Sequence, residues 1–549
     1  MLKFFDNHQE QNMTLSKLTL AVVTALGVGA SFQAKALDLY MDNKTKQLYA
    51  EPGANRTKLG SFIKVEDNAP PATDKAALDE MRQDLEKKTN EIEVLKEHVF
   101  EQKKDAAEVK LGEKGLEFES KDGNFKAAIN GRMQVDSQVN VDGNNPAPNA
   151  ATATTNQLAD STNIRRARLG IEGTFFRNYD YKFEYDFSRG NGTVAAGITD
   201  AYINWKLFEP FGVKVGQFKE PFSLEEATSN RFLTFIERNM SINTFSDNPN
   251  AYKVGLGANY NHERFALMGA VQTEPVGGGW AYNTSVNSNN TNTSGTNSVG
   301  NGNNNRNNGS GDTGWDVTGR IVGRPWLHSE RKFLHVGASG SYRSVNNNYL
   351  GDGSFSNGGM NFTSTPNANV DRTAILNTGN LTNVKLGTEV DDITRFALES
   401  ALVYRSFSAQ AEYLQTNISG KGYGSGETLD GYYGYVSYFL TGESRAYKAK
   451  TGAWDRIKPT HNFDMKNGWG AWELALGYDY LNLTDKLIKG GEAETIKAAL
   501  NWYPNSHMRL MANFVHVLDI NTASTSNSRS AAFNGADLDM LEVRGQVDW

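Results

Sequence analysis

The segment IRRARLGIEGTFFRNYDYKFEYDFS, residues 164–188, contains two runs of alternating side chains joined by a short polar turn. In the second run Tyr181 and Phe183 lie on one face, and Lys182 and Glu184 lie on the other. Side chains that alternate with a period of two predict β-strands. Strands with aromatic residues on one face and charges on the other suit a membrane barrel that encloses water. A soluble sandwich, with the apolar face turned to a core, is the alternative.

The first run of this segment favours the barrel. Leu169 and Ile171 share one face, whereas Arg166, Arg168 and Glu172 share the other. In an outer-membrane barrel the apolar face contacts lipid and the charged face lines the lumen. We therefore expect the arginines of this segment to point into the barrel.

Composition supports the same class of protein. The chain has 549 residues, of which 38% are hydrophobic and 11% aromatic, and its mean hydropathy is -0.55. A large barrel explains this combination, because only half of each strand faces lipid. The absence of cysteine excludes a disulfide framework. The formal charge of -7 argues against nucleic acid as a partner of the whole surface.

The N-terminus predicts a secretory signal peptide over residues 1–36. Lys17 precedes an apolar run over residues 18–29, and residues 34–36 read Ala-Lys-Ala, an A-x-A cleavage pattern. A transmembrane helix needs about twenty apolar residues, and this run is shorter. Residues 37–72 show little periodicity and are expected to form a linker.

Residues 73–104 are expected to form a coiled-coil helix. Apolar residues recur there every seven positions, at Leu78, Leu85, Ile92 and Val99. Such a heptad seam favours self-association, and a three-fold assembly would fit a trimeric membrane protein. The alternative is a single amphipathic helix that packs on another part of the molecule.

Residues 105–549 are expected to form the barrel. A hairpin turn at residues 122–123 leads into a strand whose apolar and polar residues alternate from Phe125, and the pattern repeats toward the C-terminus. Short turns alternate with long polar connections, as in outer-membrane barrels. The longest connections are residues 283–313, almost entirely Asn, Gly, Ser and Thr, and residues 346–392.

The chain ends on an amphipathic strand. Leu541, Val543 and Val547 alternate with polar residues, and the last residue is Trp549. Outer-membrane proteins typically end this way, because their assembly machinery recognises a last strand with a terminal aromatic residue. We therefore expect the barrel-assembly machinery to be a partner during biogenesis.

Several stretches of the chain resemble the phosphate-selective porin O/P family. They are GRMQVD at 131–136, IRRARLGIEG at 164–173, VGQFKEPFSLEEATSNRFLTFIERN at 215–239, GRIVGRPWLHSERKFLHVGASGSYR at 319–343, FLTGESRAYK at 439–448 and NWYP at 501–504. The resemblance implies an all-β fold, a transmembrane antiparallel β-barrel of sixteen strands, usually trimeric. It also implies a loop after Lys219 that folds inward and forms the constriction.

In that family, arginines at the constriction bind anions, and the resemblance assigns this role by motif. The motifs assign Arg132, Arg165, Arg166, Asp200, Ser229, Arg238, Arg320 and Arg343, and the further candidate pore or anion-binding residues are Arg168, Lys219 and Arg231. A guanidinium offers forked donors that match phosphate oxygens, and rings of Arg or Lys are a general device of anion pores. The alternative is that these arginines pair with lumen acids, such as Glu184, Asp186 and Glu399, and stiffen the wall.

Two positions depart from the family pattern. Glu226, next to Glu225, stands where anion-binding members carry a lysine. Two carboxylates there lower the anion affinity unless Arg231 or Lys219 offsets them. Gly477 stands where the family often has an arginine.

The sequence therefore predicts a porin of the bacterial outer membrane that conducts small anions, such as phosphate or polyphosphate. A general diffusion porin and an outer-membrane tether that uses the coiled coil are the alternatives. The expected partners are outer-membrane lipid, small anions and further copies of the chain in a homotrimer, and nucleic acid is not expected. No enzyme activity, metal or cofactor is expected, because the eight histidines form no catalytic motif and no phosphate loop or dinucleotide fingerprint is present.

Overall fold

The computed structural model describes most of the chain, which forms two units, residues 1–103 and 104–549. The described residues are 37–43, 48–62, 72–105, 107–112, 115–142, 158–188, 197–208, 210–247, 251–273, 314–345, 361–383, 386–525 and 527–549. The expected signal peptide and the Asn-rich connection 283–313 lie outside the described residues.

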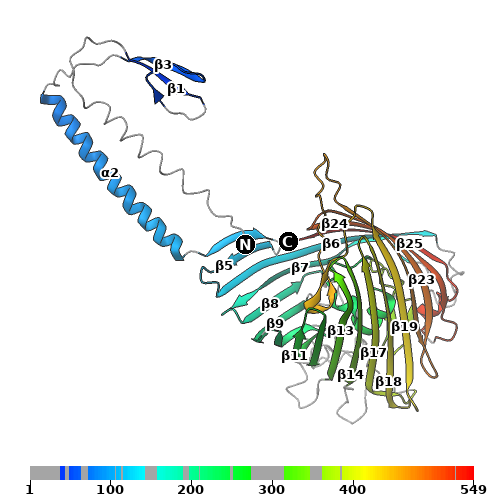
Figure 1. Ribbon diagram of the computed structural model, residues 1–549. Helices are drawn as coiled ribbons and strands as arrows, with labels where there is room; N and C mark the ends of the chain where they lie inside the picture. Colours follow the sequence, from blue (N-terminus) through cyan, green and yellow to red (C-terminus); the bar gives the residue numbers. More distant parts are fainter. Residues whose placement is uncertain are drawn as a thin grey trace. The chain divides into compact units, whose positions relative to one another are not determined.

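The N-terminal unit begins with a small antiparallel sheet (Figure 1). β1 (Leu37–Asp42) pairs with both β2 (Leu48–Tyr49) and β3 (Arg56–Phe62). On this sheet the Arg56 guanidinium lies 3.4 Å from the centre of the Tyr49 ring. Part of the expected linker is therefore folded. Strands of two to seven residues contain too few alternating positions to stand out in a sequence.

The helix α2 spans Ala72–Asp105, close to the predicted range of 73–104. Its described seam residues are between 52% and 70% exposed: Met81, Leu85, Ile92 and Leu95. A seam of exposed apolar side chains is typical of a helix that self-associates, and this association stays a prediction. No helix among the described residues combines the length and the apolar composition that a membrane crossing requires.

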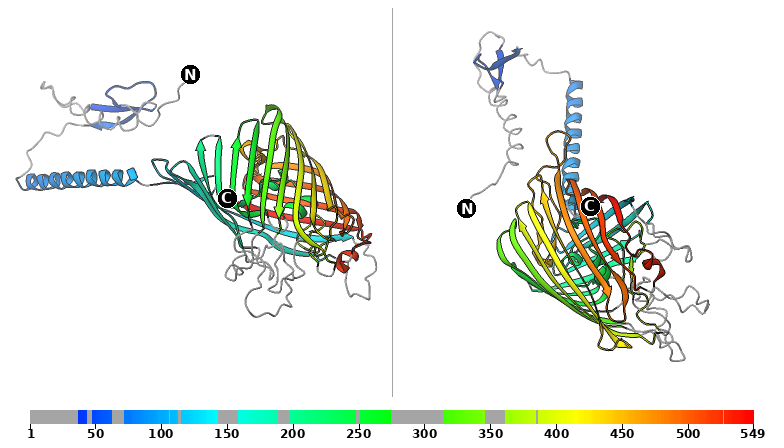
Figure 2. Two further views of the ribbon diagram at one scale, coloured as in Figure 1. Left: turned by 90° about the horizontal axis from the view of Figure 1, so that it is seen from below. Right: turned by 90° about the vertical axis from the view of Figure 1, so that its right-hand side faces the viewer.

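In the second unit, sixteen antiparallel strands close into a barrel, as expected (Figures 1 and 2). They are β6 (Phe125–Asp142), β7 (Ser161–Phe175), β8 (Tyr179–Asp186), β9 (Gly197–Phe208), β10 (Phe211–Lys219), β11 (Tyr252–Asn261), β12 (Phe265–Gln272), β13 (Trp315–Ser329), β14 (Lys332–Ser344), β17 (Glu389–Tyr404), β18 (Phe407–Lys421), β19 (Glu427–Phe439), β22 (Ala471–Thr484), β23 (Lys489–Asn505), β24 (Met508–Asn521) and β25 (Leu538–Asp548). The last strand, β25, pairs with β6 and closes the ring. Beside this closure, the backbones of Trp549 and Gly131 exchange two hydrogen bonds of 3.0 and 3.1 Å. A hairpin of β4 (Glu108–Gly112) and β5 (Gly115–Glu119) extends the first residues of β6.

Apolar and charged side chains occupy opposite faces of the barrel wall, as the alternation predicts. In β7 Leu169 is 47% exposed on the outside, whereas Arg168 is 5% exposed on the inside. In β22 Leu474 and Leu476 face outward, and Asp479 is buried in the lumen. The outward side chains are those that contact lipid in a membrane barrel.

The connections differ between the two ends of the barrel. At the end that we term the turn end, most connections have two or three residues, such as 176–178 and 405–406. At the opposite end, the loop end, connections such as 220–251 and 345–388 are long. Residues 440–470 are an exception, because this long connection lies at the turn end.

Three connections place residues inside the barrel. The inner loop, residues 220–247, carries α3 (Leu224–Ala227), α4 (Met240–Ile242) and a π-helical turn (Asn243–Asp247), and Figure 2 shows it in green within the ring of strands. The second inner segment, residues 361–383, carries β15 (Thr363–Ser364) and β16 (Leu376–Asn377). The turn-end segment, residues 440–470, carries β20 (Tyr447–Lys448), a 3-10 helix (Ala449–Thr451) and β21 (Ala453–Trp454). A further short helix, α5 (Ser528–Ala531), lies between β24 and β25.

The hydrophobic core of the protein lies within the barrel rather than between layers. Phe235, Met240 and Phe245 of the inner loop pack with Phe362 and Ile375 of the second inner segment. The edge of the Phe362 ring meets Phe245 at a centroid distance of 5.6 Å. The inner segments therefore fill part of the lumen as packed structure and leave the remainder as the candidate pathway.

Candidate functional site

The inner loop begins where β10 ends, and the carboxylate of Glu226 is neutralised near this start. Glu226 forms an ion pair with Lys219 and also contacts Arg238, whose Nε lies 3.2 Å from Oε2. Of the two cations expected to offset the charge of Glu226, Lys219 is therefore the one that does so. Arg231, the other possibility, makes no ion pair with any described residue.

Glu225 is turned into the packed interior of the inner loop. Its carboxylate accepts hydrogen bonds from the backbone N–H of Asn239 at 3.0 Å and from the Asn239 amide at 2.8 Å. Burial raises the pKa of this carboxyl group. The N–H groups of Leu224 and Glu225 donate to Glu412 of β18 at 2.9 and 2.8 Å, so the barrel wall caps the start of α3.

Two other acids attach the inner loop to the barrel wall. Glu220 accepts two hydrogen bonds from Arg395 at 2.8 and 2.7 Å and one from Lys253 at 2.6 Å. Burial alone would raise the pKa of Glu220, but the two cations outweigh it and lower the pKa to about 2. Glu237 pairs with Arg165 at 2.7 Å and with Arg544 at 3.1 Å. The loop is thus held by charges drawn from several strands.

Most of the arginines predicted to bind anions pair with carboxylates. The pairs are Arg132 with Glu184, Arg165 with Glu237, Arg168 with Glu184 and Asp186, Arg238 with Glu226, Arg320 with Glu399, and Arg343 with Asp316. Asp200 pairs with Lys182 at 2.7 Å. These arginines therefore pair with acids inside the barrel, which is the alternative to anion binding.

The structure brings one subset of the candidates together. Arg132 donates to Ser229 at 3.4 Å and to Asn230 at 2.6 Å, which joins β6 to the inner loop. Arg166 donates to Gln134 at 3.0 Å and forms no ion pair with a described residue. Arg320 and Arg343 stand on a separate part of the wall, on β13 and β14.

Arg231 differs from Arg238, the other arginine of the inner loop. Its Nε is buried without a hydrogen-bond partner, and its guanidinium lies 5.4 Å from the centre of the Phe232 ring. Burial and the nearby Arg132 lower the pKa of Arg231 to about 10. Together with Arg166, it is a candidate that forms no ion pair with a described carboxylate.

A β-bulge explains how two consecutive arginines reach the same side of the wall. Gln134 pairs with Arg166 and the next residue of β6, Val135, pairs with Ile164, so Arg165 is an extra residue in β7. A bulge of this kind redirects a side chain. Alternation alone would place Arg165 on the lipid face, and it does not predict the contact with Glu237.

The turn-end segment contacts both the barrel wall and the inner loop. Arg320 donates to the backbone carbonyls of Thr451 and Gly452 at 3.1 and 2.7 Å. The N–H of Trp454 donates to Thr228 of the inner loop at 3.2 Å. The inner loop and the turn-end segment therefore meet inside the barrel and narrow it together.

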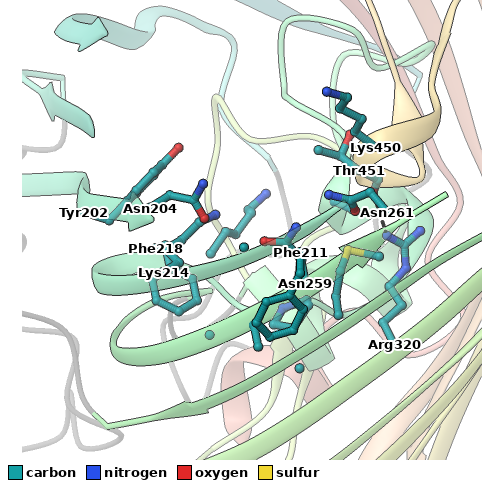
Figure 3. A pocket seen from close by; sticks show the side chains of 18 of the residues that line it. Tyr202, Asn204, Phe211, Lys214, Phe218, Asn259, Asn261, Arg320, Lys450 and Thr451 are labelled. Carbon is teal, nitrogen blue, oxygen red and sulfur yellow. Dashed lines mark hydrogen bonds between the residues drawn. The ribbon is translucent and has the colours of Figure 1, made fainter. Parts of the chain in front are cut away.

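A cavity of about 470 Å³ remains between these segments and the wall formed by β8 to β13 (Figure 3). Its lining holds six basic side chains, Lys206, Lys214, Lys219, Arg320, Lys448 and Lys450, and two acidic ones, Asp180 and Glu220. A second cavity of about 500 Å³ shares Asp180, Tyr202 and Lys448 with it. In the first cavity, basic side chains therefore outnumber acidic ones by six to two.

Lys214 is the central cation of this lining. Its ammonium lies 4.4 Å from the centre of the Tyr202 ring and 5.1 Å from that of Phe218, which is favourable for a cation over aromatic faces. No carboxylate of the described residues lies within ion-pair distance of it. By contrast, Lys206 pairs with Asp180 at 2.8 Å.

The lysines at 214, 448 and 450 were not among the predicted site residues. Lys214 has the inward parity of β10, and Lys448 belongs to the quoted stretch FLTGESRAYK, so both carried a usable signal. What the sequence lacks is the fold of the turn-end segment, which brings Lys448 and Lys450 to the wall.

Gly477, the second departure from the family pattern, makes room for the inner loop. A Cβ atom at this position would lie 3.1 Å from the ring of Phe235 and 3.1 Å from Cβ of Tyr435. The missing lumen charge at Gly477 therefore accompanies the close packing of Phe235.

One group of side chains among the described residues has metal-ligating spacing. It consists of His516, Asp537 and Asp539, with His516 Nδ1 2.8 Å from an Asp539 oxygen. The group lies at the loop end of β24 and β25, and none of its members lines the two cavities.

Comparison with known sequences gives one family and two relatives. The model of the family described as phosphate-selective porin O and P matches residues 128–549. Porin O of Pseudomonas aeruginosa is 27% identical over 425 residues, which cover 75% of this chain and 87% of that protein. An uncharacterised protein of Caulobacter vibrioides is 26% identical over 399 residues, which cover 72% of this chain and 69% of that protein.

Comparison with solved structures gives outer-membrane proteins at low sequence identity. OmpT of Vibrio cholerae aligns with a TM-score of 0.43 and 10% identity over 78% of this chain and 98% of its own. The outer-membrane channel DcaP of Acinetobacter baumannii aligns with a TM-score of 0.40 and 13% identity over 79% of this chain and 99% of its own. An anion-selective porin from Comamonas acidovorans aligns with a TM-score of 0.40 and 10% identity over 77% of this chain and 99% of its own.

Proposed function

The chain belongs to the phosphate-selective porin O and P family of the bacterial outer membrane, and from that premise we propose that its barrel conducts small anions by passive diffusion. The proposal rests on the observation that Lys214, a cation in the lumen, has no carboxylate partner among the described residues. Lys214 and Lys448 line the open cavity and form no ion pair with a described residue, whereas most of the candidate arginines are paired with carboxylates. Cations that line a pore attract anions and repel cations, most strongly where protein walls lower the dielectric.

The lysines of the cavity supply this preference more directly than the arginines. Arg132, Arg168 and Arg320 contact carboxylates, so their fields are largely cancelled at a distance. Lys214, Lys448 and Lys450 line the cavity from two different segments, β10 and the turn-end segment. A solute that crosses the barrel through this cavity passes both.

The description of the family names phosphate selectivity, and we extend this selectivity to this chain as part of the proposal. Arg166 and Arg231 are the arginines that remain for an oxyanion. Forked guanidinium donors match phosphate oxygens, so these two are the proposed phosphate contacts.

The proposal includes the biogenesis and assembly of the protein. We expect residues 1–36 to be removed as a signal peptide and the barrel-assembly machinery to recognise the last strand. Three copies would bring their α2 seams together as a coiled coil. A tether that reaches the cell wall through α2 is compatible with conduction and is the second function that the exposed seam favours.

Reversal potentials test the proposal. The purified protein is inserted into planar bilayers across a KCl gradient, and phosphate is then added as a blocker. An anion preference with block by phosphate supports the full proposal. A preference for neither ion identifies a general diffusion porin, and the absence of channels favours the tether.

A further inference from the structure

The cavity that holds the lysines also has an apolar surface. Tyr202, Phe211, Phe218 and Met268 line it together with Pro210 and Pro221. Figure 3 shows the rings of Tyr202, Phe211 and Phe218 and the amines of Lys214 and Lys450 around the same space. Inorganic anions gain nothing from such a surface, because they hold their hydration water more strongly than apolar groups can replace it.

Phe218 and Tyr202 form the apolar part of this surface and pack closely on the wall. Gly257 lies opposite Lys214 in the β-ladder, and a Cβ atom on it would lie 2.9 Å from the Phe218 ring. The ring therefore rests directly on the backbone of β11. Tyr202 meets Phe218 edge to face, with centroids 6.4 Å apart and planes at 85°.

The charged and apolar parts of the lining are adjacent. The Lys214 ammonium lies over the rings of both Tyr202 and Phe218, while Met268 and Lys450 line the same cavity. Ligand sites are mostly apolar, with a few placed polar groups, and have volumes of about 300–1,000 Å³. The volume of about 470 Å³ lies in this range.

Resting on the proposed function, we propose that the preferred solutes are organic anions with one anionic head group and a flat apolar body. The head group, a carboxylate or a phosphate monoester, pairs with Lys214 and the lysines of the turn-end segment. The apolar body lies along Tyr202 and Met268 and displaces water from them. Inorganic phosphate uses only the charge and binds this cavity less tightly.

Matched blockers test the solute class on the full-length channel in planar bilayers. Phenyl phosphate is compared with inorganic phosphate, and benzoate with acetate, so that each pair shares a head group. We expect the aromatic member of each pair to block at a concentration about tenfold lower, given partial burial of a ring. Both pairs are needed, because the head group of the preferred solute is either a carboxylate or a phosphate monoester and each pair tests one of them.

Two substitutions separate the contribution of the apolar surface to block from the contribution of the lysine charge. Met268→Ser removes apolar surface and is expected to bring benzoate block to within about twofold of acetate block, with anion preference in KCl unchanged. Lys214→Gln is expected to weaken block by all four anions. If Met268→Ser yields no channels, Tyr202→Ser provides the same test.

The outcomes separate this inference from the proposed function. Equal block within each pair, in a channel that prefers anions, overturns the inference and leaves the proposed function in place. A preference for cations in KCl overturns the proposed function and the inference with it. Aromatic preference that persists in both Met268→Ser and Tyr202→Ser also overturns the assignment to this cavity.

Discussion

Arg165 and Glu237 form a two-pronged ion pair, with Nε 2.7 Å from Oε1 and Nη2 3.0 Å from Oε2. The pair joins β7 to the inner loop, and Arg544 of β25 contacts the same carboxylate at 3.1 Å. A residue expected to bind anions is thus engaged in holding the loop that narrows the pore. Arginines such as Arg165 hold the inner loop, whereas lysines such as Lys214 line the cavity.

Removal of the Glu237 charge is expected to release the inner loop. Glu237→Gln leaves Arg165 and Arg544 without this carboxylate, and loss of one partner of a buried pair typically costs about 3–5 kcal/mol. We expect a lower temperature of barrel unfolding in detergent and noisier open-channel currents. Lys58→Gln, in the separate N-terminal sheet, is the control and should change neither. An unchanged unfolding temperature in Glu237→Gln would show that the pair does not hold the loop.

The attachment of the loop through Glu220 is expected to depend on pH. The pKa of Glu220 is lowered to about 2 because Arg395 and Lys253 outweigh its burial. A carboxyl group whose pKa is lowered in the folded state stabilises that state above its ordinary pKa of about 4.3, and this stability is lost as the pH falls through the lowered value.

The measurement is open-channel noise recorded at a series of pH values. We expect steady currents from neutral pH to about 4.5 and increasing noise as the pH approaches 2. Glu220→Gln should be noisy already at neutral pH. Loosening of the wild-type channel near pH 6 would contradict this assignment.

The packing of Phe235 against Gly477 predicts a cost for any larger residue. Gly477→Ala places a methyl group about 3.1 Å from the Phe235 ring, and overpacking of this kind typically costs about 1–3 kcal/mol. Thermal unfolding of the purified barrel measures the effect. The double variant with Phe235→Leu should recover part of the loss, and a single variant as stable as the wild type would show that the ring moves freely.

Self-association of α2 is expected to depend on its apolar seam. Leu85 and Ile92 are 66% and 52% exposed in the single chain. Leu85→Glu with Ile92→Glu places charges in the seam and should abolish cross-linking between α2 helices of neighbouring copies, without changing single-channel conductance. The double variant Glu86→Gln with Glu93→Gln changes residues off the seam and is the control. Cross-linking that survives the charged substitutions would remove the coiled coil from the account.

Alternation in the sequence predicted the two-faced strands, because the wall separates lipid from the lumen at every second residue, and the family resemblance implied the barrel of sixteen strands. Leu169 and Arg168 occupy the predicted faces for that reason. Residues 37–62 were missed because their strands are too short to show a period. Arg165 reaches the lumen because a bulge shifts the register of β7, and alternation does not predict this bulge.

The candidate site was predicted in kind but not in detail. Charge and parity indicated that arginines face the lumen, and they do. Their partners depend on the inner loop, whose acids Glu226 and Glu237 reach the wall from outside the strand pattern. Lys448 lines the cavity because the turn-end segment folds into the barrel, and no local period encodes that fold.

The most direct test of the account is the reversal potential of single channels across a KCl gradient for the wild type and for Lys214→Gln. We predict a clear anion preference in the wild type and a decrease of roughly twofold to fivefold in the chloride-to-potassium permeability ratio for the variant, the size expected when one unpaired pore charge is lost. The double variant Lys206→Gln with Asp180→Asn removes a neutral pair and should keep the wild-type ratio. A wild-type channel without anion preference, or a ratio that Lys214→Gln leaves unchanged, would contradict the lysine-lined pathway.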